Sequence, residues 1–332
     1  MKSLLSREPV SLLQKTPSKG KKKRILVVAG PTGTGKTQLS LSLAAVIGGE
    51  IVSADSAQIY RGMDIGTAKI SPEDRALITH HLVDICDVST LYNVAEFYKA
   101  AQNAFKEITL RENVPIVVGG SGFYIHTLLY GPPAGPPSTP EVRGQLEKQM
   151  EELGPEALYE RLQILDPVYA ATISEQDRHK IIRGLEIMTL SERRVSDFPK
   201  PNKLHEHEYD FRCWFIYYRR EKLYTRIDAR CDEMLKKGFV EEVRALEQQG
   251  LRENSSMSQA IGYRQALEYL KSPQTDEDFQ NFVIKFKRAS RQYAKRQFTW
   301  FRREPIFRWL DCDAYSPDRL KEIILQDFEQ ND

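Results

Sequence analysis

A glycine-rich stretch near the start of the chain has the composition and spacing of a phosphate-binding loop. It consists of Gly30, Pro31, Thr32, Gly33, Thr34, Gly35, Lys36 and Thr37, a full match to the pattern GxxxxGK followed by Ser or Thr. Backbone N–H groups of such a loop bind phosphate oxygens, the lysine adds a positive charge and the hydroxyl can bind Mg²⁺. We therefore expect residues 30–37 to bind phosphates, with Thr37 as a metal ligand. The pattern leaves open whether those phosphates belong to a nucleotide or to another diphosphate.

Two further polar residues follow apolar runs that are typical of buried strands. Asp55 comes directly after the run 50–54, and Ser121 lies in the glycine-rich turn that follows the run 114–118. Ligands of open α/β sheets bind at the carboxyl ends of the strands, so we expect both side chains near the phosphate loop. Asp55 could hold a metal ion or accept a proton from a substrate, or it could only cap a helix.

The elements that must position these residues predict a fold of the α/β class. Apolar runs at 25–29, 50–54, 82–85 and 114–118 read as strands, and helical patterns separate several of them. Strands that alternate with helices build a parallel sheet, here of the kind found in P-loop NTPases. The adjacent His80 and His81 precede the third run, and we interpret them as structural because no nucleophile is placed beside them.

A proline-rich stretch at 131–140 interrupts this pattern. A helical segment follows, in which Gly154-Pro155 and Asp166-Pro167 predict breaks, and an apolar run at 213–218 predicts a return to the sheet. Further helices are expected over 221–249, 258–270 and 276–302. The predicted organisation is a basic disordered tail (1–24), a first part of the core (25–136), an inserted helical subdomain (137–204), and a return strand with basic helices (205–332).

Composition excludes several classes of protein. The 332 residues are 41% hydrophobic and 28% charged, which is typical of a globular protein and not of a disordered or disulfide-stapled one. No apolar run approaches the roughly 20 residues that a membrane span needs, and the four scattered cysteines have no zinc-ligand spacing. We therefore expect a cytoplasmic protein with no membrane partner, and a monomer.

The last predicted helix carries an unusual charge pattern. Between residues 285 and 303 there is no acidic residue. The eight basic residues are Lys285, Lys287, Arg288, Arg291, Lys295, Arg296, Arg302 and Arg303. Solvated helices usually mix both signs of charge, so the pattern favours a polyanionic partner, most plausibly a nucleic-acid backbone.

Taken together, these residues resemble the tRNA dimethylallyltransferases (tRNA isopentenyltransferases) of the bacterial type, over nearly the whole chain. The matching stretches begin at Gly30 (GPTGTGKT), Ser53 (SADSAQIYRGMDIGTAK), His80 (HHLVDI), Val118 (VGGSGFY), Arg183 (RGLEI), Arg226 (RID), Ala260 (AIGYRQ) and Ala294 (AKRQFTWFR). The resemblance implies transfer of a dimethylallyl group from dimethylallyl diphosphate to N6 of the adenosine 3′ of the anticodon, position 37, with Mg²⁺, in tRNAs that read codons beginning with U.

The resemblance also implies roles for single residues. Asp55 would be the general base, and Lys36 and Ser121 would act on the diphosphate, although the family usually has Thr at the position of Ser121. The implied contacts with the tRNA anticodon stem-loop are Asp55, Ser56, Ala57, Gln58, Ser121, Arg143, His179, Lys180, Arg183, Gln259, Gly262, Tyr263, Arg264, Arg291, Lys295 and Arg296.

Other functions remain open at this point. The phosphate loop with Asp55 would also suit a small-molecule kinase that turns over ATP. A prenyltransferase could instead modify free AMP, ADP or ATP, but such a substrate needs neither the basic helix nor the insertion. A non-catalytic RNA-binding protein would have no use for the intact phosphate loop.

Overall fold

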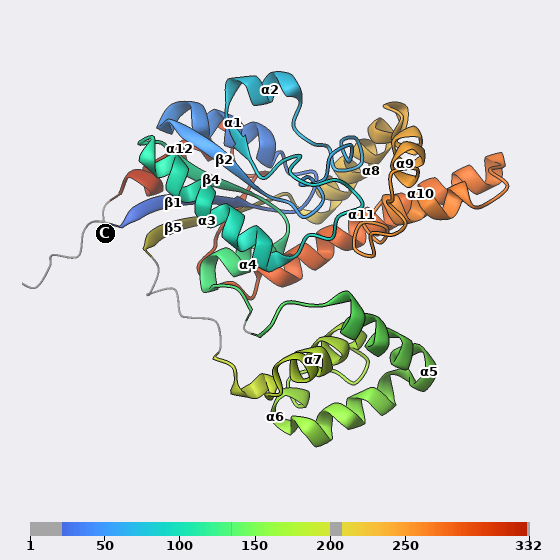
Figure 1. Cartoon of the computed structure of the whole chain (residues 1–332). Coiled ribbons are helices and arrows are strands. Elements are labelled where there is room, and N and C mark those ends of the chain that lie inside the picture. Colours follow the sequence, from blue (N-terminus) through green and yellow to red (C-terminus); the bar gives the residue numbers. More distant parts are fainter. Residues whose placement is uncertain (1–21, 134, 200–207, 331–332) are drawn as a thin grey trace, which may run out of the picture.

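The computed structural model describes residues 22–133, 135–199 and 208–330, and a parallel β-sheet forms its centre (Figure 1). Within these residues, the strands pair in the order β3-β2-β4-β1-β5-β6, and every pair is parallel. The strands are β1 Lys23–Ala29, β2 Gly49–Ala54, β3 His80–His81, β4 Val114–Gly119, β5 Tyr209–Tyr217 and β6 Arg308–Asp311. The predicted α/β class is confirmed.

Helices cover both faces of the sheet. They are α1 Lys36–Ile47 and α12 Pro317–Glu329 on one face, and α3 Val94–Leu110 and α4 Gly122–Tyr130 on the other; the short α2 is Pro72–Leu77. Strand β1 shows why two layers are needed, because Leu26 and Val28 pack with α1 and α12 whereas Ile25, Val27 and Ala29 pack with α3 and α4. A strand that is apolar on both faces must be buried on both.

A group of helices lies beyond the carboxyl ends of the strands. They are α8 Arg220–Lys236, α9 Phe239–Glu247, α10 Tyr263–Leu270 and α11 Asp276–Phe301. Their apolar faces form a core of their own around Phe239, Tyr263, Phe282 and Phe286. Helix α11 runs from this group back to α4, so one long helix connects the two parts (Figure 1).

A separate helical lobe projects between α4 and β5 (Figure 1). It contains α5 Pro140–Leu165, α6 Pro167–Ala170, α7 Arg178–Ser191 and the 3-10 turn η1 Val195–Asp197. Leu146, Leu162, Ile181 and Leu185 pack together as its core. The break predicted at Gly154-Pro155 is present, because Gly154 has a φ of 81° inside α5. Gly tolerates this left-handed conformation, whereas other residues are strained in it.

Several predicted boundaries were wrong. The third strand is His80–His81 and not 82–85, because Leu82 and Asp84 have left-handed φ values of 61° and 57° that no strand accommodates. The helix predicted over 221–249 is two helices, broken at Gly238, where φ is 91°.

The remaining corrections concern the ends of elements. The helix predicted from residue 258 begins only at Tyr263. Lys23 and Arg24 belong to β1 and not to the tail, whose residues 1–21 lie outside the described part. The short β6 and helix α12 were not predicted. No helix in the described ranges is both long and apolar enough to span a membrane.

Candidate functional site

The sheet brings the candidate residues of three loops to one edge. The phosphate loop follows β1, Asp55 follows β2, and Gly119-Gly120 ends β4, whose neighbours in the sheet are β1 and β2. Helices α8 and α11 close the space above this edge. The result is a cavity of about 400 Å³. Ten of the predicted site residues line it: Thr32, Lys36, Thr37, Asp55, Ser56, Ala57, Gln58, Gln259, Tyr263 and Arg296.

The phosphate loop has the backbone geometry that its glycines predict. Gly33 and Gly35 have φ values of 83° and 88°, and α1 begins directly afterwards at Lys36. A Cβ atom on Gly30 would lie 2.4 Å from the carbonyl oxygen of Ile216, so no larger residue fits against β5 there. The loop therefore presents backbone N–H groups and a helix N-terminus at the cavity, which is an arrangement that binds anions.

The side chain of Lys36 is held in place by a hydrogen bond within this loop. Its Nζ donates a hydrogen bond to the carbonyl oxygen of Pro31 at 2.8 Å. The pKa of Lys36 is lowered to about 7, mainly by burial and also by the positive charge of Arg230, while the carboxylate of Asp55 opposes the change. A bound diphosphate would favour the charged lysine, so the site gains positive charge when its anion arrives.

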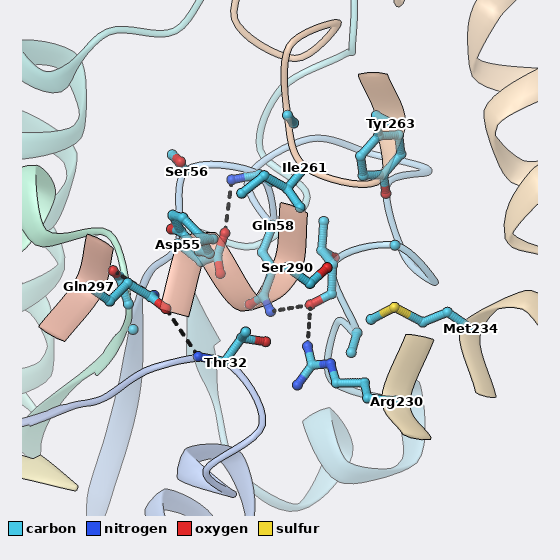
Figure 2. A pocket seen from close by; sticks show the side chains of 18 of the residues that line it. Thr32, Asp55, Ser56, Gln58, Arg230, Met234, Ile261, Tyr263, Ser290 and Gln297 are labelled. Atoms are coloured by element: carbon cyan, nitrogen blue, oxygen red, sulfur yellow. Dashed lines mark hydrogen bonds between the residues drawn. The ribbon is translucent and has the colours of Figure 1, made fainter. Parts of the chain in front are cut away.

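A glutamine ties the phosphate loop to the neighbouring strand. Gln297 of α11 accepts a hydrogen bond from the backbone N–H of Thr32 at 3.1 Å and donates one to the carbonyl oxygen of Gly120 at 2.9 Å. Figure 2 shows the first of these bonds. The side chain is only 5% exposed. Because the oxygen and the nitrogen of its amide are both bonded, Gln297 fixes the distance between two loops that line the cavity.

Asp55 and the residues after it form the second wall. One carboxylate oxygen of Asp55 accepts a hydrogen bond from the backbone N–H of Ala57 at 3.0 Å, which fixes the direction of the group. Gln58 donates to the carbonyl oxygen of Thr67 at 3.3 Å. Ser121 stands behind this wall, where its hydroxyl oxygen accepts a hydrogen bond from the backbone N–H of Ser56 at 3.1 Å. Ser121 thus supports the wall and does not itself line the cavity.

Arg230 of α8 is a site residue that the sequence analysis missed. It lines the cavity, and its Nη2 donates to the same carbonyl oxygen of Thr67 as Gln58 does (Figure 2). Burial lowers its pKa, and its buried Nε has no hydrogen-bond partner within the described chain. A buried cation with an unsatisfied donor that faces a cavity is suited to an anionic ligand.

A second arginine of α8 supports the phosphate loop from outside. Arg226 donates from Nε to the carbonyl oxygen of Gly33 at 2.8 Å. A regular spacing could have revealed both arginines, because Lys222, Arg226 and Arg230 recur every four residues on one helix face.

The cavity also has an apolar wall. Met234, Met257, Ile261 and Phe286 line it together with the phosphate loop and Asp55. Figure 2 shows Met234 and Ile261 in the same space as Asp55 and Arg230. One cavity can therefore hold a charged group at one end and an apolar chain beside it.

Two of the predicted RNA contacts, Tyr263 and Gly262, are buried and packed against other residues of the protein. Tyr263 is 1% exposed, and its hydroxyl donates to Glu242 at 2.7 Å. The Glu242 carboxylate also accepts hydrogen bonds from the backbone N–H groups of residues 64–66. Gly262 is buried with a φ of 88°, and a Cβ atom there would lie 2.8 Å from the ring of Phe286. These two residues shape the cavity wall.

The basic residues of α11 divide into two groups. Helix α8 supplies acids to the acid-free part of α11 from residue 285 on, because Lys287 pairs with Asp232 at 2.6 Å and Arg291 with Asp228 at 2.6 Å. These two cations therefore have acidic partners that the sequence of their own helix does not reveal. Arg296 lines the cavity, whereas Lys295 lies on the opposite face of the helix, and Arg264 is exposed on α10.

The predicted contacts of the lobe do not reach the cavity. Arg183 pairs with the fully buried Glu186 at 2.7 Å and donates to the carbonyl oxygen of Pro136 at 2.6 Å. Arg143 lies 3.9 Å from the same carboxylate. His179 and Lys180 are exposed in the first turn of α7. The two arginines thus fasten the lobe to its entry segment.

The oxygen atoms of the cavity suit Mg²⁺ if the ion is also bound by substrate phosphates and water. No cluster of three or more His, Cys, Asp or Glu residues that could hold a metal occurs among the residues described. Mg²⁺ is commonly bound by one or two protein oxygens together with substrate phosphates and water. Thr37, which lines the cavity at the start of α1, offers a hydroxyl oxygen that fits this arrangement.

The chain is similar to proteins of one enzyme family. The sequence model of the IPP transferase family matches residues 58–304. A tRNA dimethylallyltransferase of Protochlamydia amoebophila is 56% identical over 93% of this chain and 90% of its own length. The corresponding protein of Chlamydia caviae is 46% identical over 92% and 90%.

Solved structures agree with this assignment. The tRNA isopentenylpyrophosphate transferase of Bacillus halodurans is 34% identical, with a TM-score of 0.66 over 93% of this chain and 97% of that one. A eukaryotic dimethylallyltransferase acting on tRNA is 29% identical, with a TM-score of 0.72 over 87% of this chain and 74% of that one. The chain therefore belongs to the IPP transferase family.

Proposed function

We propose that this chain transfers a dimethylallyl group from dimethylallyl diphosphate to N6 of the adenosine at position 37 of tRNAs that read codons beginning with U. The observation that carries the proposal is the joint lining of one cavity by the phosphate loop, an apolar wall and Asp55. Family membership supports transfer chemistry over phosphorylation.

The diphosphate end of the donor would lie on the phosphate loop. Loop N–H groups, Lys36 and Arg230 hold its oxygens and stabilise the negative charge that grows as the C1–O bond breaks and the diphosphate takes the electron pair. When bound at Thr37, Mg²⁺ would supply further positive charge to the leaving diphosphate. Met234 and Ile261 exclude water from the apolar group beside it.

The adenine would enter past Ser56, Ala57 and Gln58. Its N6 nitrogen forms a bond to C1 of the dimethylallyl group, and the nitrogen then loses a proton. Asp55 is oriented to accept that proton, because Ala57 holds one of its two carboxylate oxygens. The products are the N6-modified adenosine and diphosphate, so atoms and charge balance.

The tRNA must release its target base from the anticodon-loop stack. Extrusion of a base costs a few kcal/mol, which contacts with the phosphate backbone can offset. Arg296 at the cavity, and His179 and Lys180 on the lobe, are the exposed or cavity-lining candidates for such contacts. We propose that the chain acts as a monomer.

One incubation tests the proposal. The protein and Mg²⁺ are mixed with labelled dimethylallyl diphosphate and, in parallel, with an anticodon stem-loop, the same stem-loop with guanosine at position 37, AMP or ATP. We expect label only in the adenosine-containing stem-loop, because guanosine lacks the N6 amine. Label in AMP or ATP would instead indicate a mononucleotide prenyltransferase, and ATP hydrolysis without prenyl transfer would indicate a kinase.

A further inference from the structure

A second cavity of about 400 Å³ lies on the far side of α11 from the one described above. It is formed by the first turns of α8 and the last turns of α11. Lys295 and Phe298 of α11 line this groove, whereas Arg296 and Gln297, their immediate neighbours, line the first cavity. Successive helix residues point about 100° apart, so α11 separates the two cavities.

The groove lies next to the end of a row of ion pairs between α8 and α11. Helices α8 and α11 pair Asp232 with Lys287 and, one turn along, Asp228 with Arg291. One turn further, the α8 residue is Tyr224 and the α11 residue is Lys295. Continuation of the row would require an acid at position 224, and a tyrosine stands there instead.

Three cations in the groove consequently lack an acidic partner. Arg220, Lys295 and Arg302 are exposed, and none forms an ion pair within the described chain, whereas nearby Arg219 and Lys222 pair with Asp311 and Asp313. An unpaired cluster of this kind suits an anion such as a phosphate.

Aromatic rings lie directly beside these charges. The Arg220 guanidinium is 5.3 Å from the ring centroid of Tyr224, and that of Arg302 is 6.0 Å from the ring of Phe298. Phe298 is held in place by Phe215, Tyr217 and Trp309, at centroid distances of 5.6 to 6.1 Å. A fixed aromatic platform next to unpaired cations is the arrangement that stacks a nucleobase and binds its phosphate.

We propose that this groove is a second RNA-binding site, which takes an unpaired nucleotide of the tRNA outside the catalytic cavity. The inference rests on the proposed function for the identity of the RNA. Its charge favours RNA over a basic protein segment, because the residues that line the groove include no acid. A backbone that passes around α11 can contact Arg296 on one side and Lys295 on the other.

Charge reversal in the groove tests the electrostatic part. The double variant R220E/R302E is compared with K99E/K106E, which makes the same charge change at two exposed lysines of α3 that also lack ion pairs in the described chain. We expect the groove variant to raise the Kd for unmodified tRNA about tenfold and to lower the salt slope by about one to two. The control should keep both values near those of the wild type.

Substitution of the platform tests the stacking part. Y224A should raise the Kd for tRNA about fivefold, and Y224F should restore it, because Phe keeps the ring. The rate of prenyl transfer at saturating tRNA, and the affinity for dimethylallyl diphosphate, should stay unchanged in all of these variants.

Two results would overturn the inference. One is a tRNA affinity of R220E/R302E equal to that of the control variant. The other is that R220E/R302E binds tRNA as the wild type does but no longer binds AMP, which would make the groove a site for free nucleotides. Binding of tRNA is measured separately from prenyl transfer, so the two proposals can fail independently. If the proposed function is wrong, the wild-type protein transfers no prenyl group. If only this inference is wrong, the wild-type protein still transfers it.

Discussion

Single residues of the cavity are held by bonds that leave their reactive atoms free. Asp55 uses one carboxylate oxygen for Ala57 and keeps the other, and Arg230 uses one nitrogen for Thr67 and keeps Nε unpaired. Such pre-oriented groups need little rearrangement when a ligand binds.

Replacement of Asp55 by Asn should separate catalysis from binding. An amide keeps the hydrogen bond with Ala57 but cannot accept the proton, so we expect the single-turnover rate to fall by about 10² to 10⁴. The Kd for tRNA should change by less than about twofold. Asp87→Asn, at an exposed acid of a surface ion pair, serves as the control. A nearly normal rate for Asp55→Asn would remove this residue as the base.

Diphosphate affinity should depend on pH through Lys36. Its pKa is lowered to about 7, so the lysine loses its charge as the pH rises above that value. The donor's phosphates are already ionised there, so the affinity should fall by up to about tenfold per pH unit between pH 7.5 and 9. Titration calorimetry with dimethylallyl diphosphate measures this slope. Lys36→Met should bind weakly at every pH, and an unchanged wild-type affinity from pH 7 to 9 would contradict the role.

Helix α11 acts as the element that joins the parts of the site. Its side chains bridge the phosphate loop to β4 through Gln297, pair with α8 through Arg291, and line both cavities. The backbone segments that pack against this helix leave little room for larger side chains. The backbone of Gly120 is the clearest case, because a Cβ atom there would lie 2.2 Å from Nε2 of Gln297.

Gly120→Ala should therefore loosen the phosphate loop. The added methyl group displaces the Gln297 amide, and we expect the diphosphate Kd to rise about tenfold together with a stability loss of about 1–3 kcal/mol. Thermal unfolding and calorimetry measure the two effects. Gly144→Ala is the matched control, since a Cβ atom at this position of α5 meets nothing within 4 Å. Equal behaviour of the two variants would show that the glutamine bridge is dispensable.

At the scale of the whole molecule, the lobe is attached through one buried carboxylate. Glu186 of α7 is 0% exposed and bonds Ser138, the backbone N–H of Thr139, and Arg183. These partners come from the segment that enters the lobe, so the carboxylate fixes how α7 sits on that segment. The lobe has its own apolar core, so its local stability can change independently of the sheet.

Glu186→Gln should destabilise the lobe selectively. The neutral amide leaves Arg183 without its charged partner, at a cost of about 1–3 kcal/mol. Hydrogen exchange should become faster in α5 and α7 and stay unchanged in β1 and β4. Glu147→Gln, which removes an exposed partner of Arg143, should change exchange little. Uniformly faster exchange over the whole chain would show that the lobe does not open as a separate unit.

The sequence alone determined the features that depend on neighbouring residues. The phosphate loop is eight contiguous residues, so its type and position followed from spacing. The alternation of apolar runs with helical patterns likewise predicted a parallel sheet and placed Asp55 at its carboxyl edge. The two-residue strand His80–His81 and the helix break at Gly238 were not predicted, because both depend on local backbone angles that composition does not record.

Only the tertiary structure decided which distant side chains meet. Gln297 lies 265 residues from Thr32, and Arg230 lies 163 from Thr67, so neither pairing leaves a local pattern. The charges of α11 show the same limit, since the acids that neutralise Lys287 and Arg291 belong to another helix. Charge patterning counts residues along one element, whereas electrostatic energy depends on distance in space, and folding sets that distance.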